Sequence, residues 1–86
     1  MPLQIFNSTD DVCGALRQAI GAALPDATIT VTPNSPGHFE LDVVSTAFAG
    51  KSMVKQQQLV YAAIKDLMAG EGAPVHAIDR LRTRTP

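Results

Sequence analysis

Cysteine is nearly absent from this chain, and long apolar runs are absent altogether. Cys13 is its only cysteine, so the chain forms no internal disulfide, and such usage is typical of a reducing compartment. No stretch approaches the roughly 18 apolar residues of a transmembrane helix. The N-terminus lacks a basic segment followed by an apolar one, so we expect no signal peptide. These absences predict a soluble, cytoplasmic protein.

Charge of either sign is also scarce, and enzyme motifs are missing. Only 17% of the 86 residues are charged, and the net charge is −1. That balance does not favour a strong overall attraction to nucleic acid or to anionic membranes. The sequence has no GxGxxG, P-loop, HExxH, CxxC or GxSxG motif, and its acidic residues are scattered. A chain of this length forms one domain with little room for a large internal cavity, so we expect no enzyme.

The hydrophobic periodicity predicts an α+β domain. Residues 8–24 and 52–70 show helical spacing, with cap-type residues at their starts. Residues 27–32, 38–45 and 75–83 read as strands, and the cluster of turn-forming residues at 33–37 predicts a hairpin between the first two. A break near residues 56–58 would split the second helix. Helices on one face of a three-stranded sheet make a two-layer sandwich.

The expected inward face of the second helix is a stripe of apolar residues: Met53, Val60, Ile64, Leu67 and Met68. Gln57 falls on the same stripe, so its amide needs a hydrogen-bonding partner, which we expect in the backbone of a neighbouring loop. Cys13 lies beside the apolar stripe of the first helix. We expect it to be a small buried side chain rather than a nucleophile.

Two histidines are candidate ligands. His76 stands at the start of the last expected strand, and His38 stands at the end of the hairpin loop. Each is either an ordinary residue at a strand entry or a metal ligand, because neutral imidazole is a common nitrogen ligand. One histidine cannot hold a metal alone. A site at His76 therefore requires His38 or ligands from a partner.

Arginines recur at every second position of the last expected strand. In an extended chain, Arg80, Arg82 and Arg84 share one face, and His76 falls on that face too. The row fits either an acidic or phosphate-bearing partner or an ordinary solvated face.

Several short motifs resemble those of the BolA family over nearly the whole chain. They are "HF" at the second strand, "VVS" before "FAGKS", "LVY" in the long helix and "VHAI" at the last strand. The double glutamine in "VKQQQLVY" is most similar to the YrbA/IbaG branch of bacterial BolA-like proteins. The resemblance implies a class II KH-like fold, αββααβ, with a three-stranded mixed sheet. The first helix and first strand match in position and character only.

The resemblance also implies a partner and a shared cofactor. BolA-like proteins share a [2Fe-2S] cluster with a monothiol glutaredoxin, and His76 matches the family's histidine ligand. The loop "TPNSPG" holds neither Cys nor His, so either His38 takes the place of the second ligand or that ligand is absent. Arg80, Arg82, Ser35 and Lys51 are candidate partner contacts. Alone, the chain would be a monomer or a weak homodimer.

A second function stays open at this point. Some BolA proteins are described as transcription regulators of the stress-response type, and KH domains bind nucleic acid. KH domains clamp single strands with a GxxG loop, and none occurs here. A steep fall in affinity with salt would reveal phosphate contacts.

Overall fold

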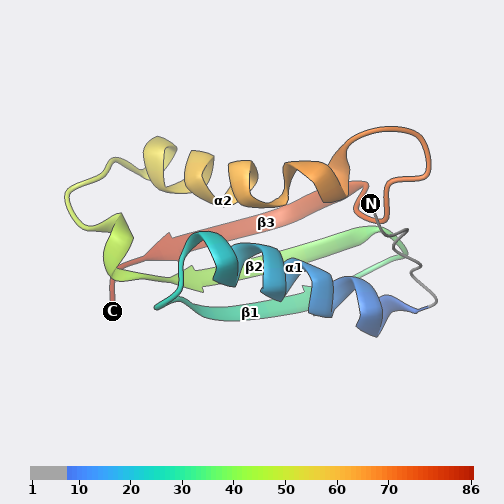
Figure 1. Ribbon diagram of the computed structural model, residues 1–86, viewed down its shortest axis with the longest axis horizontal. Coiled ribbons are helices and arrows are strands. Elements are labelled where there is room, and N and C mark those ends of the chain that lie inside the picture. The colour runs from blue at the N-terminus through green and yellow to red at the C-terminus, as the bar shows by residue number, and fades with distance from the viewer. Residues whose placement is uncertain (1–7) are drawn as a thin grey trace.

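The computed structural model describes residues 8–86 as two helices packed on one face of a sheet (Figure 1). The expected absence of a signal peptide falls mainly on residues 1–7, which lie outside the described residues. The elements, in chain order, are α1 Thr9–Ala23, β1 Thr28–Pro33, β2 His38–Val44, a short 3₁₀ helix η1 Thr46–Phe48, α2 Met53–Met68 and β3 Ala77–Arg84. The predicted two-layer α+β sandwich is confirmed. No helix among residues 8–86 is long and apolar enough to cross a bilayer.

Serine side chains cap both long helices. Ser8 accepts a hydrogen bond from the Asp11 amide at the start of α1, and Ser52 accepts one from the Lys55 amide at the start of α2. These bonds satisfy amides that have no partner within the helix. Asp10 and Asp11 add favourable negative charge to the first turn of α1.

The sheet is mixed, with strand order β1-β2-β3. β1 and β2 form the predicted antiparallel hairpin, and β2 pairs with β3 in parallel. The β2–β3 register is broken once. Phe39 pairs with Ile78 but Glu40 pairs with Arg80, so Asp79 is an extra residue, a β-bulge in β3.

The core lies between the helices and the inner face of the sheet. Its largest fully buried side chains include Phe39, Phe48, Leu16, Ile20 and Ile64. The alternation predicted for β2 is confirmed, because Phe39, Leu41 and Val43 are buried while their neighbours are half-buried. Met53 departs from the predicted inward stripe of α2. It lies in the first turn, beyond the core, and is 54% exposed.

The predicted break near residues 56–58 is wrong. α2 runs unbroken from Met53 to Met68. The side-chain amides of Gln56 and Gln57 donate to backbone carbonyls outside the helix, so they do not disturb the backbone hydrogen bonds within it. The short additional helix lies earlier, at η1, where the Ser45 side chain caps it by accepting from the Ala47 amide.

Asp26, in the loop between α1 and β1, is hydrogen-bonded to residues at the start of η1. Its carboxylate accepts hydrogen bonds from Thr46 Oγ1 at 2.7 Å, Ser45 Oγ at 2.7 Å and the Thr46 amide at 2.8 Å. These bonds, led by the Thr46 side chain, stabilise the charged form and lower the pKa of Asp26 to about 2.

Candidate functional site

The hairpin loop between β1 and β2 forms a tight turn built on proline and glycine. The His38 amide donates to the Ser35 carbonyl at 2.9 Å, which places Pro36 and Gly37 at the two central positions. Gly37 has φ of +79°, a left-handed conformation that the second central position of a type II turn requires. The loop predicted from turn-forming residues is confirmed.

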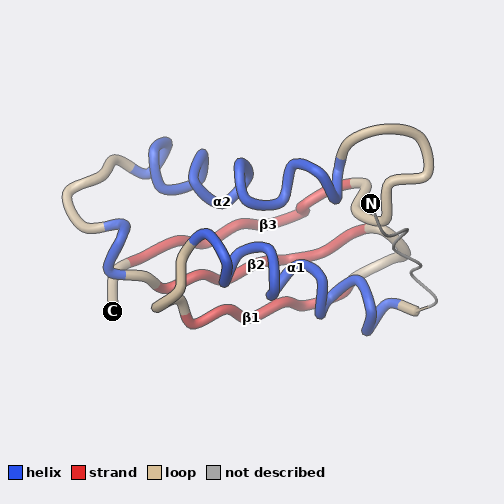
Figure 2. The backbone as a smooth tube through the Cα atoms, viewed as in Figure 1, coloured by secondary structure: helices blue, strands red, loops and turns tan. Residues whose placement is uncertain are grey.

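His76 lies directly against this turn. The Gly37 carbonyl accepts hydrogen bonds from the amides of His76, at 2.8 Å, and Ala77, at 3.1 Å. A Cβ at position 37 would lie 2.7 Å from both Cγ and Nδ1 of His76, so only glycine allows the imidazole to approach this closely. Figure 2 shows the two loops, 34–37 and 69–76, meeting at the same end of the sheet.

The orientation of the His76 ring follows from these contacts. The ring atoms nearest the position of that Cβ are Cγ, Nδ1 and Cε1, so Nε2 is on the side turned away from Gly37. The residue itself is exposed. An incoming group therefore meets Nε2 of an imidazole whose backbone is fixed on both sides by the hairpin loop.

The same loop is fastened to the β-bulge through Asp79. His38 Nδ1 lies 2.9 Å from Asp79 Oδ1, and Asn34 Nδ2 donates to Asp79 Oδ2 at 3.0 Å. The hydrogen bond with His38, followed by the one from Asn34, lowers the pKa of Asp79 below its usual value. A carboxylate on Nδ1 leaves Nε2 of His38 as the ring nitrogen without this contact, an arrangement often seen behind histidine ligands.

Sequence reasoning missed Asp79 and Asn34 because neither lies near His38 in the chain. Asp79 lies beside His38 because it is the extra residue of the bulge, and no motif in the sequence predicts that bulge. The bulge also corrects the expectation that His76 shares the face of the arginine row. The extra residue shifts the alternation by one, so Ala77 pairs with His38 on the outer face and His76 precedes the strand.

Metal-binding side chains do not cluster in the part of the chain that the structure describes. Within residues 8–86, no group of three or more His, Cys, Asp or Glu side chains is placed to bind a metal ion. Cys13 is 5% exposed within α1, as predicted, and burial raises the pKa of its thiol. His76 and His38 are thus the donors available to an external centre, one against the turn and the other on the outer face.

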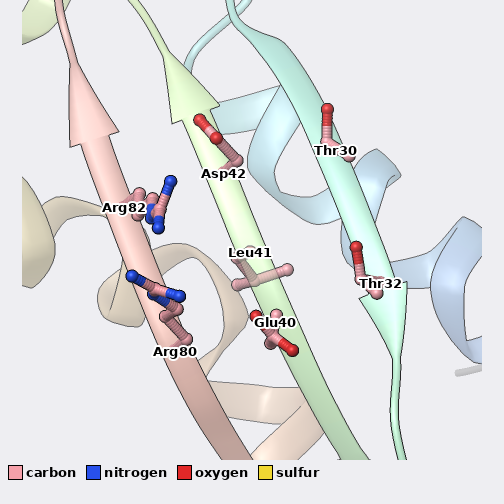
Figure 3. A pocket seen from close by; sticks show the side chains of 7 residues that line it. All are labelled: Thr30, Thr32, Glu40, Leu41, Asp42, Arg80 and Arg82. Carbon is pink, nitrogen blue, oxygen red and sulfur yellow. The ribbon is translucent and has the colours of Figure 1, made fainter.

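The outer face of the sheet carries Arg80 and Arg82, two members of the arginine row (Figure 3). Arg80 and Arg82 lie beside Glu40 and Asp42 in register, yet no ion pair to either arginine forms among the described residues. A shallow hollow of about 220 Å³ lies between the three strands. It is lined by Thr30, Thr32, Glu40, Leu41, Asp42, Arg80 and Arg82.

The candidate partner contacts do not gather in one place. Ser35 is exposed in the hairpin loop, beside His38 and next to the turn that carries His76. Lys51 is exposed between η1 and α2, at the end of the sheet where the Ser45 amide donates to the Arg84 carbonyl. That is the opposite end from His76, so one compact surface does not include Lys51 and the two histidines (Figure 1).

Gln57 has the backbone partner that its position demands. Its Nε2 donates to the Leu81 carbonyl at 3.4 Å. The partner is a carbonyl of β3, however, and not of a loop as expected. The side chain reaches it because α2 packs along this strand.

The arrangement of two helices on one face of a β1-β2-β3 mixed sheet defines a class II KH-like α+β domain. The family model described as BolA-like protein matches residues 15–86. The chain therefore belongs to the BolA-like family, as its motifs indicated.

Individual relatives agree with this assignment. The chain is 38% identical over 63 residues to an uncharacterized protein from the rpoN-murA intergenic region of Acinetobacter guillouiae, covering 73% of this chain and 72% of that protein. It is 43% identical over 56 residues to BolA-like protein 1 of Bos taurus, covering 65% of this chain and only 38% of that longer protein. The solution structure of BolA1 from Mus musculus superposes with a TM-score of 0.72 at 27% identity, covering 100% of this chain and 76% of that one. The bacterial relative is consistent with the predicted YrbA/IbaG branch.

Proposed function

We propose that this chain is an adaptor that binds a monothiol glutaredoxin and shares a [2Fe-2S] cluster with it, for iron–sulfur cluster handling or iron sensing. The observation that carries the proposal is His76, an exposed residue whose backbone is bonded to Gly37 and whose Nε2 lies on the side of the ring away from Gly37. Family membership supplies the expectation of the partner. The role is one of binding rather than catalysis, and we place it in the cytoplasm.

The metal-binding side chains of this chain fit a cluster held between two proteins better than a cluster held by this chain alone. A [2Fe-2S] cluster takes four ligands, usually thiolates, and histidine replaces some of them in certain proteins. This chain offers His76 and, as a second candidate, His38, while its one thiol is buried in α1. The partner must therefore provide the thiolate ligands.

Imidazole ligation has two chemical consequences. Histidine in place of a thiolate raises the reduction potential of a [2Fe-2S] centre. It also makes binding depend on pH, since the ligand must be deprotonated. Asp79 would act on His38 rather than on His76, because its oxygens bond to His38 and Asn34.

The test is anaerobic reconstitution of the chain with a monothiol glutaredoxin, glutathione, iron and sulfide. Visible absorbance and circular dichroism are recorded for the wild type, His76→Ala, His38→Ala and the exposed α1 control Gln18→Ala. We expect a heterodimer spectrum for wild type and Gln18→Ala, and the spectrum of the glutaredoxin homodimer for His76→Ala. Loss of the signal in His38→Ala would make His38 the second ligand.

Two results would overturn parts of the proposal. If the wild type forms no complex and changes no spectrum, the adaptor function fails. If His76→Ala keeps the wild-type spectrum, the complex stands but His76 is not a ligand. Calorimetric titration of the apo proteins separates loss of the cluster from loss of the protein–protein contact.

A further inference from the structure

The β-bulge at Asp79 turns an acidic side chain toward the candidate site. Asp79 is the extra residue of β3, because Glu40 pairs with Arg80 where an unbroken register would pair it with Asp79. Two like charges at paired positions of a sheet are destabilising. The bulge gives the position beside Glu40 to Arg80 and lets Asp79 face the hairpin loop. Bulges beside functional sites commonly redirect a side chain in this way.

The Asp79 carboxylate holds both ends of the hairpin turn. Its Oδ1 lies 2.9 Å from His38 Nδ1, and its Oδ2 accepts a hydrogen bond from Asn34 Nδ2 at 3.0 Å. Asn34 and His38 also meet through the backbone, where the Asn34 amide donates to the His38 carbonyl at 2.9 Å. One carboxylate therefore closes the turn 34–38 from the outside. We call Asp79, Asn34 and His38 the latch of this turn.

His76 is bonded to the residue that lies inside the latched turn. The Gly37 carbonyl accepts from the amides of His76 and Ala77, and a Cβ on Gly37 would lie 2.7 Å from the imidazole. The Asp79 side chain bonds to the two ends of the turn rather than to His76, so its effect on His76 is transmitted by the position of Gly37. Residues 76–79 and the turn thus hold each other at two places, at Gly37 and at the latch.

We propose that Asp79 and Asn34 are positioning residues for the His76 imidazole. The latch fixes the turn, and the Gly37 carbonyl then fixes the backbone of His76. The close approach of the ring to Gly37 keeps Nε2 on the far side. This role rests on the proposed function, which makes Nε2 the ligand atom. Groups behind a metal ligand commonly orient it in this way.

A geometric role fits the exposure of the latch better than a stabilising one. The side chains of His38 and Asp79 are 39% and 40% exposed, and ion pairs in contact with solvent contribute little to stability. His38 is unsuitable as the test position, because it is both a latch residue and a candidate ligand. Asp79 and Asn34 can be replaced without removing either candidate ligand.

The first test examines the isotope-labelled apo protein by NMR spectroscopy, without iron or a partner. Asp79→Ala removes both side-chain bonds of the latch, and Asn34→Ala removes one of them. In both variants we expect the ring resonances of His76 to shift and its amide to exchange faster with solvent, with the larger effect in Asp79→Ala. The amides of Leu41 and Val43 in the central strand should exchange at the wild-type rate, which shows that the fold is intact.

Two further variants separate geometry from charge. Asp42→Ala removes a carboxylate of the outer face that forms no ion pair among residues 8–86, and it should leave His76 unchanged. Asp79→Asn removes the charge but keeps the shape, and its amide can bond to both His38 and Asn34 once the Asn34 amide turns round. We expect Asp79→Asn to behave as the wild type. If it behaves as Asp79→Ala, the charge and not the latch acts on the site, and the positioning role is refuted.

The second test uses the complex reconstituted with a monothiol glutaredoxin, followed by visible circular dichroism. Removing a group that orients a metal ligand typically lowers metal affinity about 10–100-fold. For Asp79→Ala we expect cluster retention about tenfold weaker, at the low end because the effect passes through the turn. Unchanged resonances and amide exchange of His76 in Asp79→Ala would overturn the positioning role. A wild type that takes up no cluster would overturn the proposed function alone, because the apo measurements decide the latch independently.

Discussion

Replacing Gly37 with alanine tests whether the hairpin turn positions His76. The new Cβ would lie 2.7 Å from Cγ and Nδ1 of His76, at a backbone φ of +79°. A left-handed alanine costs about 1–2 kcal/mol. The overpacking adds about 1 kcal/mol, at the low end of its range because the exposed ring has room to move away. We expect the melting temperature to fall by roughly 10–20 °C for a total of about 2–3 kcal/mol.

Gly50 provides the matched control. It has φ of +73° but nothing within 4 Å of the added Cβ, so Gly50→Ala carries the backbone strain alone. The excess cost of Gly37→Ala over Gly50→Ala measures the contact with His76. In the double variant Gly37→Ala/His76→Ala that excess should vanish, a coupling of about 1 kcal/mol.

The assay is urea unfolding followed by far-ultraviolet circular dichroism, because the chain has no tryptophan. Ring resonances of the two histidines give a second readout, and those of His76 should move in Gly37→Ala but not in Gly50→Ala. Equal destabilisation by the two glycine substitutions, with unmoved His76 signals, would refute the positioning role of Gly37.

Two further predictions concern the rest of the fold. Asp26→Asn should lower stability at neutral pH and flatten the acid part of the stability curve. Since the folded state holds the pKa of Asp26 at about 2 against 3.8, its stabilisation is complete above 3.8 and disappears as the pH falls toward 2. Urea midpoints of both proteins across this range check it, and parallel curves would contradict it. The Cys13 thiol, 5% exposed with a raised pKa, should react with a thiol-specific disulfide reagent much more slowly in the native protein than in urea, and equal rates would refute its burial.

Local patterns were sufficient to predict most elements of the fold. The alternation in residues 38–44, the serine caps and the turn cluster at 33–37 each correspond to an observed element. Periodicity failed at the ends of elements, where side chains leave the core. Met53 lies in the first turn of α2 and is exposed. The last strand was predicted to start at residue 75 but starts at Ala77, where its pairing with His38 of β2 begins.

The site could be predicted only in part. His76 is a predicted ligand because of its resemblance to a family motif, and His38 because of its place in a loop; both stay predictions. The hydrogen bonds of Asp79 to both His38 and Asn34 join residues more than 40 positions apart, which no local pattern reports. The positions of Lys51 and the histidines at opposite ends of the sheet likewise depend on the direction in which β2 and β3 run.

The sequence by itself determined the number, type and order of the elements, because side-chain periodicity and turn chemistry act over a few residues. Tertiary structure alone decided the bulge at Asp79, the contact of Gly37 with His76 and the place of β3 at one side of the sheet. Each of these depends on the register between strands and on the packing of α2 along β3. Register is a property of paired segments, so it exists only once the chain has brought them together.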